Sequence, residues 1–154
     1  MCFILPWAHR TPSEALKRRQ KMMKTEAKSV GFSYEHSDGW KGFGPVSERI
    51  VSMESKRLSY IYESILENGY IEDYGYIGGQ LFMDNGTYYV TPKDGWHRTA
   101  VLKVLGYDTI PMRFKKSWLP VRRSEVKLWP NVQNGWFSVK EALTVLDHIY
   151  PFKL

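Results

Sequence analysis

The six residues from position 94 to position 99 carry the strongest chemical signal in this sequence. They are Asp94, Gly95, Trp96, His97, Arg98 and Thr99, and they follow a β-prone run. Glycine allows a backbone to approach a ligand closely. Arg98 offers a planar fork of N–H donors and His97 offers a further donor, while the Thr99 hydroxyl can bind an oxygen. At the start of a helix, exposed amides and the positive end of the helix dipole favour anions. We call this segment the 94–99 turn and predict a phosphate site there.

A second explanation of the same residues needs no ligand. Aspartate is a common helix N-cap, so Asp94 would cap the following helix while His97 and Arg98 face solvent. In the functional interpretation, Asp94 instead orients His97 or helps to hold a metal ion. The residues alone leave both explanations open.

The secondary-structure elements before and after the 94–99 turn must position it. Two β-prone runs, 76–82 and 87–91, are separated by Asn85-Gly86, a pair that favours a tight hairpin turn. After the turn, we expect a short helix over 97–105 and a strand over 110–114.

The clearest amphipathic helix precedes the hairpin. Its apolar residues follow the i, i+3, i+4, i+7 and i+8 spacing of one helix face. They are Leu58, Ile61, Tyr62, Ile65 and Leu66. Asn68-Gly69 supplies the stop signal.

Two further helices are predicted from capping boxes, in which a hydroxyl residue and a glutamate three positions later satisfy each other's backbone groups. Thr11 and Glu14 start a surface helix that runs to about residue 28 with a basic outer face. Ser138 and Glu141 start a terminal helix whose apolar stripe includes Tyr150.

The remaining segments are predicted to be irregular. Residues 31–45 are rich in glycine and read as a long loop, and residues 129–136 are turn-like. The apolar residues near the start, 2–7, are expected to form an arm that packs on the domain, because they are too few to span a membrane.

The order of these motifs resembles the ParB/sulfiredoxin-like superfamily. Its members carry an Asp-Gly-x-His/Arg-Arg turn, a short helix that ends in Leu-Gly, and an Ile/Val-Pro strand. These correspond here to residues 94–100, Leu105-Gly106 and Ile110-Pro111. Upstream, Glu63-Ser64-Ile65 and Asn68-Gly69 are similar to the Ser-Ile helix of that family. The resemblance spans residues 49–115.

The resemblance implies that a nucleotide such as ATP, ADP or CTP, accompanied by Mg²⁺, binds at the turn. The residues expected to contact it are Ser64, Gly95, Trp96, His97, Arg98 and Thr99. The expected catalytic residues are Glu54, Asp94 and His97. Glu54 corresponds to the glutamate that serves as base ahead of the Ser-Ile helix in ParB-like kinases, although its separation from Ser64 is shorter than in the serine kinases of that family.

Branches of the superfamily differ in their chemistry. Sulfiredoxins use a cysteine where Trp96 stands, and a tryptophan cannot attack a sulfinyl phosphate, so sulfiredoxin activity is excluded. Chromosome-partitioning members continue into a helix-turn-helix module, and the sequence after residue 115 shows no clear helix pair. The expected function is therefore that of a kinase or nucleotide hydrolase that acts on a hydroxyl-bearing small molecule or a modified base.

The fold expected from this resemblance is an α+β, ParB/sulfiredoxin-like domain with a small mixed β-sheet flanked by helices. We expect a single domain over residues 1–154. Within it, residues 1–45 form an N-terminal helix and loop, residues 46–116 the core, and residues 117–154 a C-terminal extension with a capped helix.

The distribution of charge keeps other functions open. The net charge is +6, and six of the 22 basic residues lie in 11–28 while six more lie in 113–127. Such stretches fit a nucleic-acid-binding or nuclease-like protein, or they keep the surface soluble. A third alternative is an interaction protein that has kept the fold without nucleotide chemistry.

Composition also sets the expected compartment and cofactors. A single cysteine, Cys2, cannot form an internal disulfide, which suits the reducing cytoplasm. We expect no membrane partner. Histidines His9, His36 and His148 have no neighbouring ligand residues at metal-binding spacing, so no dedicated metal site is predicted.

Overall fold

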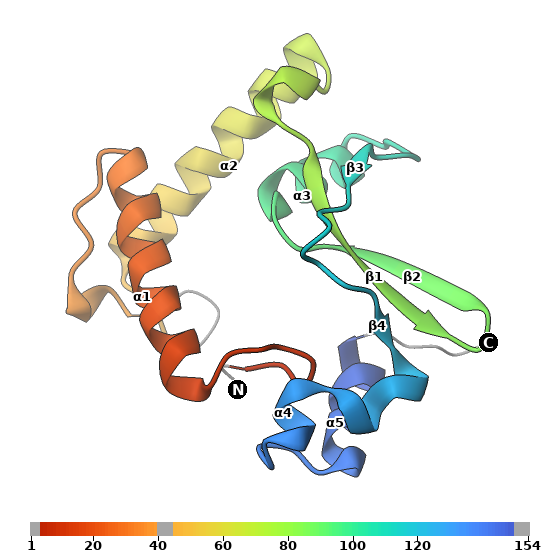
Figure 1. The fold of residues 1–154 in the computed structure, drawn as a ribbon. Helices are drawn as coiled ribbons and strands as arrows, with labels where there is room; N and C mark the ends of the chain where they lie inside the picture. Colours follow the sequence, from red (N-terminus) through yellow and green to blue (C-terminus); the bar gives the residue numbers. More distant parts are fainter. Residues whose placement is uncertain (1–3, 40–44, 150–154) are drawn as a thin grey trace. The chain divides into compact units, whose positions relative to one another are not determined.

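The computed structural model describes residues 4–39 and 45–149, apart from the side chain of residue 74. The chain forms two compact units, one made of Met1–Val51 with Arg123–Leu154 and the other of Ser52–Arg122. Figure 1 shows the order of helices and strands along the chain. None of the helices in the described ranges combines the length and the apolar character that a membrane span requires.

A β-hairpin forms the centre of the 52–122 unit. Strand β1 (Ile77–Asp84) pairs antiparallel with β2 (Thr87–Pro92), and Asp84 lies opposite Thr87. The turn therefore has two residues, Asn85 and Gly86, which both have positive φ angles of 45° and 82°. Positive φ at both central positions is the mark of a type I′ turn, whose twist matches that of the strands. The predicted hairpin is confirmed.

Two short parallel strands complete a small mixed sheet, in agreement with the expected α+β class. Strand β3 (Met112–Arg113) pairs with Ile77 and Gly78 at the start of β1. Strand β4 (Val121–Arg122) pairs farther along β1, as Figure 1 also shows. The predicted strand over 110–114 is shorter than expected, and Pro111 within it has no amide hydrogen to donate to a ladder.

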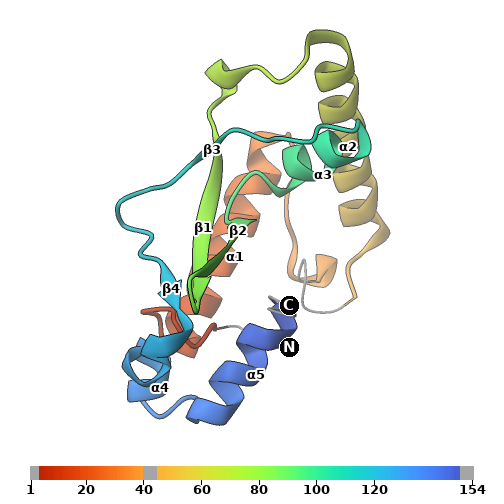
Figure 2. The same cartoon turned by 90° about the vertical axis from the view of Figure 1, so that its right-hand side faces the viewer.

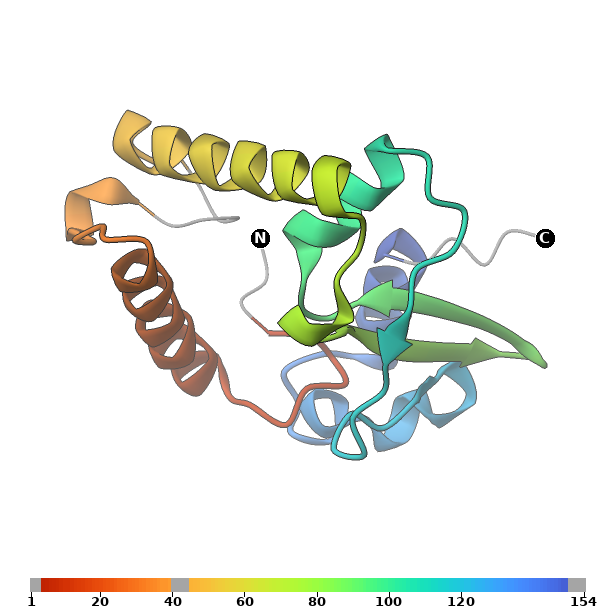
Figure 3. The ribbon, with the colours of Figure 1, turned by 90° about the horizontal axis from the view of Figure 1, so that it is seen from above.

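Helices α2 (Glu48–Asn68) and α3 (Trp96–Val104) enclose the core of this unit. The buried residues are Ile65, Ile77, Val101 and Leu102, and Ile61, Tyr70, Leu105, Ile110 and Met112 pack against them. Figure 3 shows the second half of α2 beside α3. Helix α2 begins well before the predicted apolar stripe, because the Ser47 hydroxyl accepts the amide of Ile50 at 3.3 Å and caps it.

Both predicted capping boxes are present in the other unit. Thr11 and Glu14 exchange hydrogen bonds at the start of α1 (Pro12–Ser29). Ser138 and Glu141 do the same at the start of α5 (Val139–Ile149). Residues 150–154 lie outside the described part, so the predicted role of Tyr150 stays open.

The segment predicted to be turn-like is partly helical. A 3₁₀ helix, η3 (Arg123–Leu128), leads into the one-turn helix α4 (Pro130–Gln133), which has proline at its first position. Figure 2 shows the chain before α1 running past α4. Trp7 of that segment meets Trp129 edge to face, with ring centroids 5.3 Å apart. The expectation that the apolar arm packs on the domain is thus confirmed for its described residues.

Asn131 ties these segments together. Its side-chain Nδ2 donates to the carbonyls of Leu5 at 2.9 Å and Arg10 at 3.2 Å. Its backbone amide donates to the Pro6 carbonyl at 3.0 Å. The residue is fully buried, so these bonds replace water that the carbonyls would otherwise bind.

The predicted loop over 31–45 is ordered by a buried carboxylate where it is described. Asp38, in a 3₁₀ turn (η1, His36–Asp38), accepts the Ser47 hydroxyl at 2.6 Å and the Glu35 amide at 2.9 Å. These hydrogen bonds, together with nearby Arg49, lower the pKa of Asp38. Trp40 to Gly44 lie outside the described residues.

Candidate functional site

The 94–99 turn forms the junction between β2 and α3. The Lys93 amide donates to the Gly78 carbonyl at 2.7 Å, which keeps the chain against β1 up to the turn. Gly95 is the N-cap of α3, with a left-handed φ of 73°. It has no side chain with which to cap the helix. The first amides of α3 have no acceptor inside the helix, so this helix start presents donors suited to an anion.

Glycine is favoured at the N-cap of α3. A Cβ on Gly95 would lie 3.0 Å from Cγ1 of Ile77 and 3.4 Å from Nη2 of Arg98, so these side chains would have to shift. The positive φ adds strain for a residue with a side chain. The expectation that Gly95 lets the backbone approach a phosphate stays a prediction.

The guanidinium group of Arg98 folds back over the start of its own helix. Its Nη1 donates to the carbonyl of Gly75, in the loop before β1. Its Nη2 lies beside Gly95, because a Cβ added to that glycine would be 3.4 Å from it. The positive charge of Arg98 is consequently held next to the N-cap, where the helix dipole also attracts an anion.

His97 pairs with Glu54, which is 43 positions earlier in the chain. Nε2 of His97 lies 2.7 Å from Oε2 of Glu54, and the two side chains are 30% and 21% exposed. An ionised carboxylate only accepts hydrogen bonds, so Nε2 carries the hydrogen and Nδ1 is the nitrogen whose lone pair can take up a proton. The second oxygen of Glu54 lies 3.9 Å from Nη1 of Arg57.

The packing of α2 on α3 explains this meeting. Glu54 shares one face of α2 with Ile61 and Ile65, which lie about two and three turns farther on. His97 precedes Val101 by one turn on α3. Ile61 and Ile65 pack in the same core as Val101. Glu54 and His97 lie on the same two helix faces, so their side chains also meet.

The contacts of Asp94 differ from both sequence-based explanations. Its Oδ1 accepts the amide of Gly78 on β1, and its Oδ2 lies 3.6 Å from Nζ of Lys115. Gly95 and not Asp94 is the N-cap of α3. Nε2 of His97 contacts Glu54 and not Asp94, and the predicted catalytic role of Asp94 stays a prediction. The carboxylate of Asp94 instead anchors the turn to the sheet.

Thr99 makes a local hydrogen bond, and Ser64 lies away from the turn along α2. The Thr99 hydroxyl donates to the Gly95 carbonyl at 3.2 Å, within the first turn of α3. Ser64 lies ten residues after Glu54, about 15 Å farther along α2. No hydrogen bond joins its hydroxyl to a described residue of the turn. Contact of Ser64 with a phosphate therefore stays a prediction.

Sequence reasoning missed a cationic aromatic cluster beside the turn. Nζ of Lys93 lies 4.8 Å from the ring centroid of Trp118, and Nζ of Lys115 lies 4.6 Å from it. A Cβ on Gly78 would lie 2.5 Å from this indole ring. The Gly78-Gly79 pair within a β-prone run was the available signal, because glycine inside a strand often marks a close approach.

The described side chains do not form a metal site by themselves. No group of three histidine, cysteine or acidic side chains gathers anywhere in the described ranges. Near the turn, Asp94 faces Lys115 and Glu54 faces His97 and Arg57. A magnesium ion at this site would depend mainly on the phosphates of a nucleotide and on water for its ligands.

Comparison of the chain with family models, with curated proteins and with solved structures finds no match. The resemblance to ParB-like proteins therefore stays a prediction from the motifs. What the 94–99 turn can do is argued below from its own geometry.

Proposed function

We propose that this protein binds a nucleoside triphosphate or diphosphate at the 94–99 turn and transfers a phosphoryl group to a hydroxyl. The acceptor would be a hydroxyl-bearing small molecule, a modified base, or water. The observation that supports this most is the hydrogen bond between His97 and Glu54 beside the open start of α3. A proton acceptor and a cluster of anion-binding donors would thus lie within one turn of helix.

Three kinds of donor support phosphate binding. The amides at the start of α3 point toward the N-terminal side of the helix. The guanidinium of Arg98 is held at the same place by Gly75, and planar guanidinium groups bind phosphate oxygens in pairs. Lys115 is half-exposed next to Asp94 and can turn toward a phosphate as a point charge.

Trp96 supports a nucleotide as the bearer of the phosphate. It is the first residue of α3 and is 61% exposed. An exposed indole next to a phosphate site offers a surface on which a nucleobase can stack, and such stacking tolerates any base. In this proposal Trp96 takes a binding role at the position where sulfiredoxins carry their cysteine.

Phosphoryl transfer needs positioning and charge neutralisation more than covalent help. The acceptor oxygen attacks the terminal phosphorus as the bond from that phosphorus to the bridging oxygen breaks. A triphosphate donor then leaves as the nucleoside diphosphate, and a diphosphate donor leaves as the monophosphate. The proton of the acceptor hydroxyl passes to Nδ1 of His97. Glu54 acts as a positioning residue, because it fixes the hydrogen on Nε2 and stabilises the imidazolium that forms.

A thermal-shift panel tests ligand binding. ATP, ADP, CTP and GTP, each with Mg²⁺, are added to the wild type, to Arg98→Ala and to Lys103→Ala, an exposed control on the same helix. A ligand at 100 times its dissociation constant stabilises the native state by about 2.7 kcal/mol. At least one nucleotide should raise the melting temperature of the wild type and of the control, and Arg98→Ala should respond much less. The proposal fails if no nucleotide shifts the wild type, or if Arg98→Ala responds like the control.

A further inference from the structure

Four lysines of α1 form a continuous ridge in the unit that does not contain the 94–99 turn. They are Lys17, Lys21, Lys24 and Lys28, and all four are exposed. Their spacing of i, i+4, i+7 and i+11 places them within an arc of about 60° on the helix. The ridge extends about 16 Å along the axis. We call it the lysine ridge.

Only one acidic residue of α1 interacts with the lysine ridge. The carboxylate of Glu14 accepts hydrogen bonds from the amide and the hydroxyl of Thr11, and nearby Lys17 helps to lower its pKa. Glu26 lies about 170° around the helix from the centre of the ridge. The four positive charges of the ridge are therefore offset by one carboxylate at its N-terminal end.

Helix stability does not explain such a pattern. Lysines four residues apart, such as Lys17 with Lys21 and Lys24 with Lys28, repel each other and destabilise the helix. Glutamate at one position of each pair would stabilise the helix. A ridge of one sign is expected where a polyanion supplies the missing negative charge.

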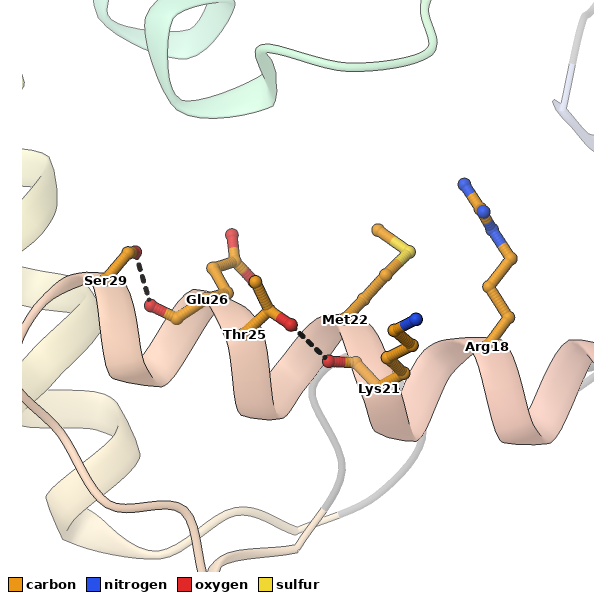
Figure 4. A pocket seen from close by; sticks show the side chains of 6 residues that line it. All are labelled: Arg18, Lys21, Met22, Thr25, Glu26 and Ser29. Carbon is orange, nitrogen blue, oxygen red and sulfur yellow. Dashed lines mark hydrogen bonds between the residues drawn. The ribbon is translucent and has the colours of Figure 1, made fainter.

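A shallow hollow beside the ridge adds a fifth cation. Its lining residues are Arg18, Lys21, Met22, Thr25, Glu26 and Ser29. Figure 4 shows the side chain of Arg18 extending away from the helix axis. The hydroxyls of Thr25 and Ser29 donate to carbonyls of α1 at 2.9 and 2.7 Å. They are therefore already satisfied, and the charged groups of the hollow are Arg18, Lys21 and the carboxylate of Glu26.

The basic stretch over 113–127 differs from the lysine ridge, because several of its cations contact other side chains of the protein. Lys115 lies near Asp94, and Arg123 forms an ion pair with Asp147. Arg113 stacks over Tyr76, with 5.9 Å between the guanidinium carbon and the ring centroid. Several cations of 113–127 thus have partners within the chain, whereas the four lysines of the ridge are exposed to solvent.

A nucleic acid fits the lysine ridge better than an anionic membrane. A helix that lies on a membrane inserts an apolar face next to its basic one. The apolar residues Met23 and Ala27 of α1 are buried in the protein, and among its large apolar side chains only Met22 is exposed, at 45%. Phosphate backbones need only the cations. One strand of duplex DNA presents a phosphate every 3.4 Å or so of axis, so the ridge would face about five.

We propose that the lysine ridge binds the phosphate backbone of a nucleic acid without reading its sequence. The ridge would hold the protein on a polyanion while the 94–99 turn, in the other unit, performs its own chemistry. The two proposals use different residues, so either can fail without the other.

Fluorescence anisotropy with a labelled 20-base-pair DNA duplex and a 20-nucleotide single strand tests the ridge. The variants are Lys24→Gln/Lys28→Gln and Lys17→Gln/Lys21→Gln, which keep helix-forming residues at exposed positions. The matched control is Lys103→Gln/Lys140→Gln, which loses the same charge from α3 and α5. Circular dichroism checks that helix content is unchanged.

The wild type should bind with a log–log salt slope of about −3 to −4 on duplex, as expected when four lysines each release counterions. Each ridge variant should lose about half of that slope and bind roughly tenfold more weakly at low salt. The control and Arg98→Ala should bind like the wild type, and the ridge variants should keep the nucleotide-dependent thermal shift. The proposal is overturned if the control weakens as much as the ridge variants, if the salt slopes do not change, or if the wild type binds vesicles of phosphatidylserine and not either nucleic acid.

Discussion

A single hydrogen bond between His97 and Glu54 joins two residues that are 43 positions apart and, in the proposed mechanism, orients the histidine as a base. Sequence analysis identified both residues as candidate catalytic residues but did not predict that they contact each other. Glu54 was matched to a base by its position in the motif, and His97 was assigned to Asp94. The structure brings the first two together because the faces of α2 and α3 pack, a relation that no local spacing encodes.

Replacement of these residues should separate chemistry from binding. In His97→Ala, release of phosphate from the nucleotide that gives the largest thermal shift should fall by about 10²- to 10⁴-fold, the usual contribution of a positioned base. The affinity for that nucleotide should change little. In Glu54→Gln, the rate should fall less than in His97→Ala, because the amide oxygen can still accept the hydrogen bond from Nε2 while the carboxylate charge is lost.

Lys103→Ala is the control for this pair of variants, since it removes an exposed side chain from α3. Steady-state rates and nucleotide titrations measure the two effects. A purely structural role for the pair would lower binding and rate together. That outcome would contradict the assignment of His97 as the proton acceptor.

Single polar residues away from a motif were not predictable. Asp38 is buried and accepts hydrogen bonds from the amide of Glu35 and the hydroxyl of Ser47. Asn131 is buried and donates to carbonyls near the start of the chain. Each stands alone in a stretch without periodicity, so only the folded chain reveals these bonds. Gly95 and Arg98 were predictable because the chemistry of a helix start restricts the residue types that suit it.

At the scale of elements, the features with a local cause were predicted best. The hairpin depended on Asn85-Gly86 and the two capped helices on hydroxyl–glutamate pairs, and all three are confirmed. The strands β3 and β4 have two residues each, and α4 has four. Elements of that length span only about one repeat of a hydrophobic pattern, which is too little to recognise, so β4 and α4 were missed.

Two glycines of the 52–122 unit allow the shape of the turn to be tested. Gly95 and Gly106 flank α3, and both have positive φ, 73° and 79°. A Cβ on Gly106 would meet nothing within 4 Å, whereas one on Gly95 would press on Ile77. Gly106→Ala should therefore cost only the left-handed strain, about 1 kcal/mol of unfolding free energy, and Gly95→Ala should cost clearly more.

Urea unfolding of the two alanine variants and the wild type gives this difference directly. Gly95→Ala should also weaken nucleotide binding, because the added methyl group lies next to Arg98. Equal stability losses in the two variants would show that the turn has room at Gly95, and the close packing described for it would then be wrong.

At the scale of the whole molecule, the chain builds one unit from its two ends and the other from its middle. The sequence-based division into a core over 46–116 and two extensions stays a prediction. Asn131 shows how the ends are joined within their unit, because its side chain holds the carbonyls of Leu5 and Arg10. A polar residue with that task is costly to replace, since its partners are backbone groups that cannot turn away.

Asn131→Ala should lower the free energy of unfolding by about 2 to 4 kcal/mol, because two carbonyls lose their donor. Asn134→Ala, an exposed change at the end of α4, should stay within about 0.5 kcal/mol of the wild type. Chemical denaturation followed by tryptophan fluorescence measures both. A cost for Asn131→Ala as small as that of the control would mean that the first residues are held by other contacts.

The central proposal is that a phosphate group lies against the first amides of α3. A ¹H–¹⁵N correlation spectrum of the labelled protein, recorded during titration with ATP and Mg²⁺, observes those amides individually. The amide signals of Trp96, His97 and Arg98 should move most and saturate together, while those of α5 stay in place. If the nucleotide leaves these three amides unmoved, or moves only signals outside the 94–99 turn, the phosphate site is not at this turn.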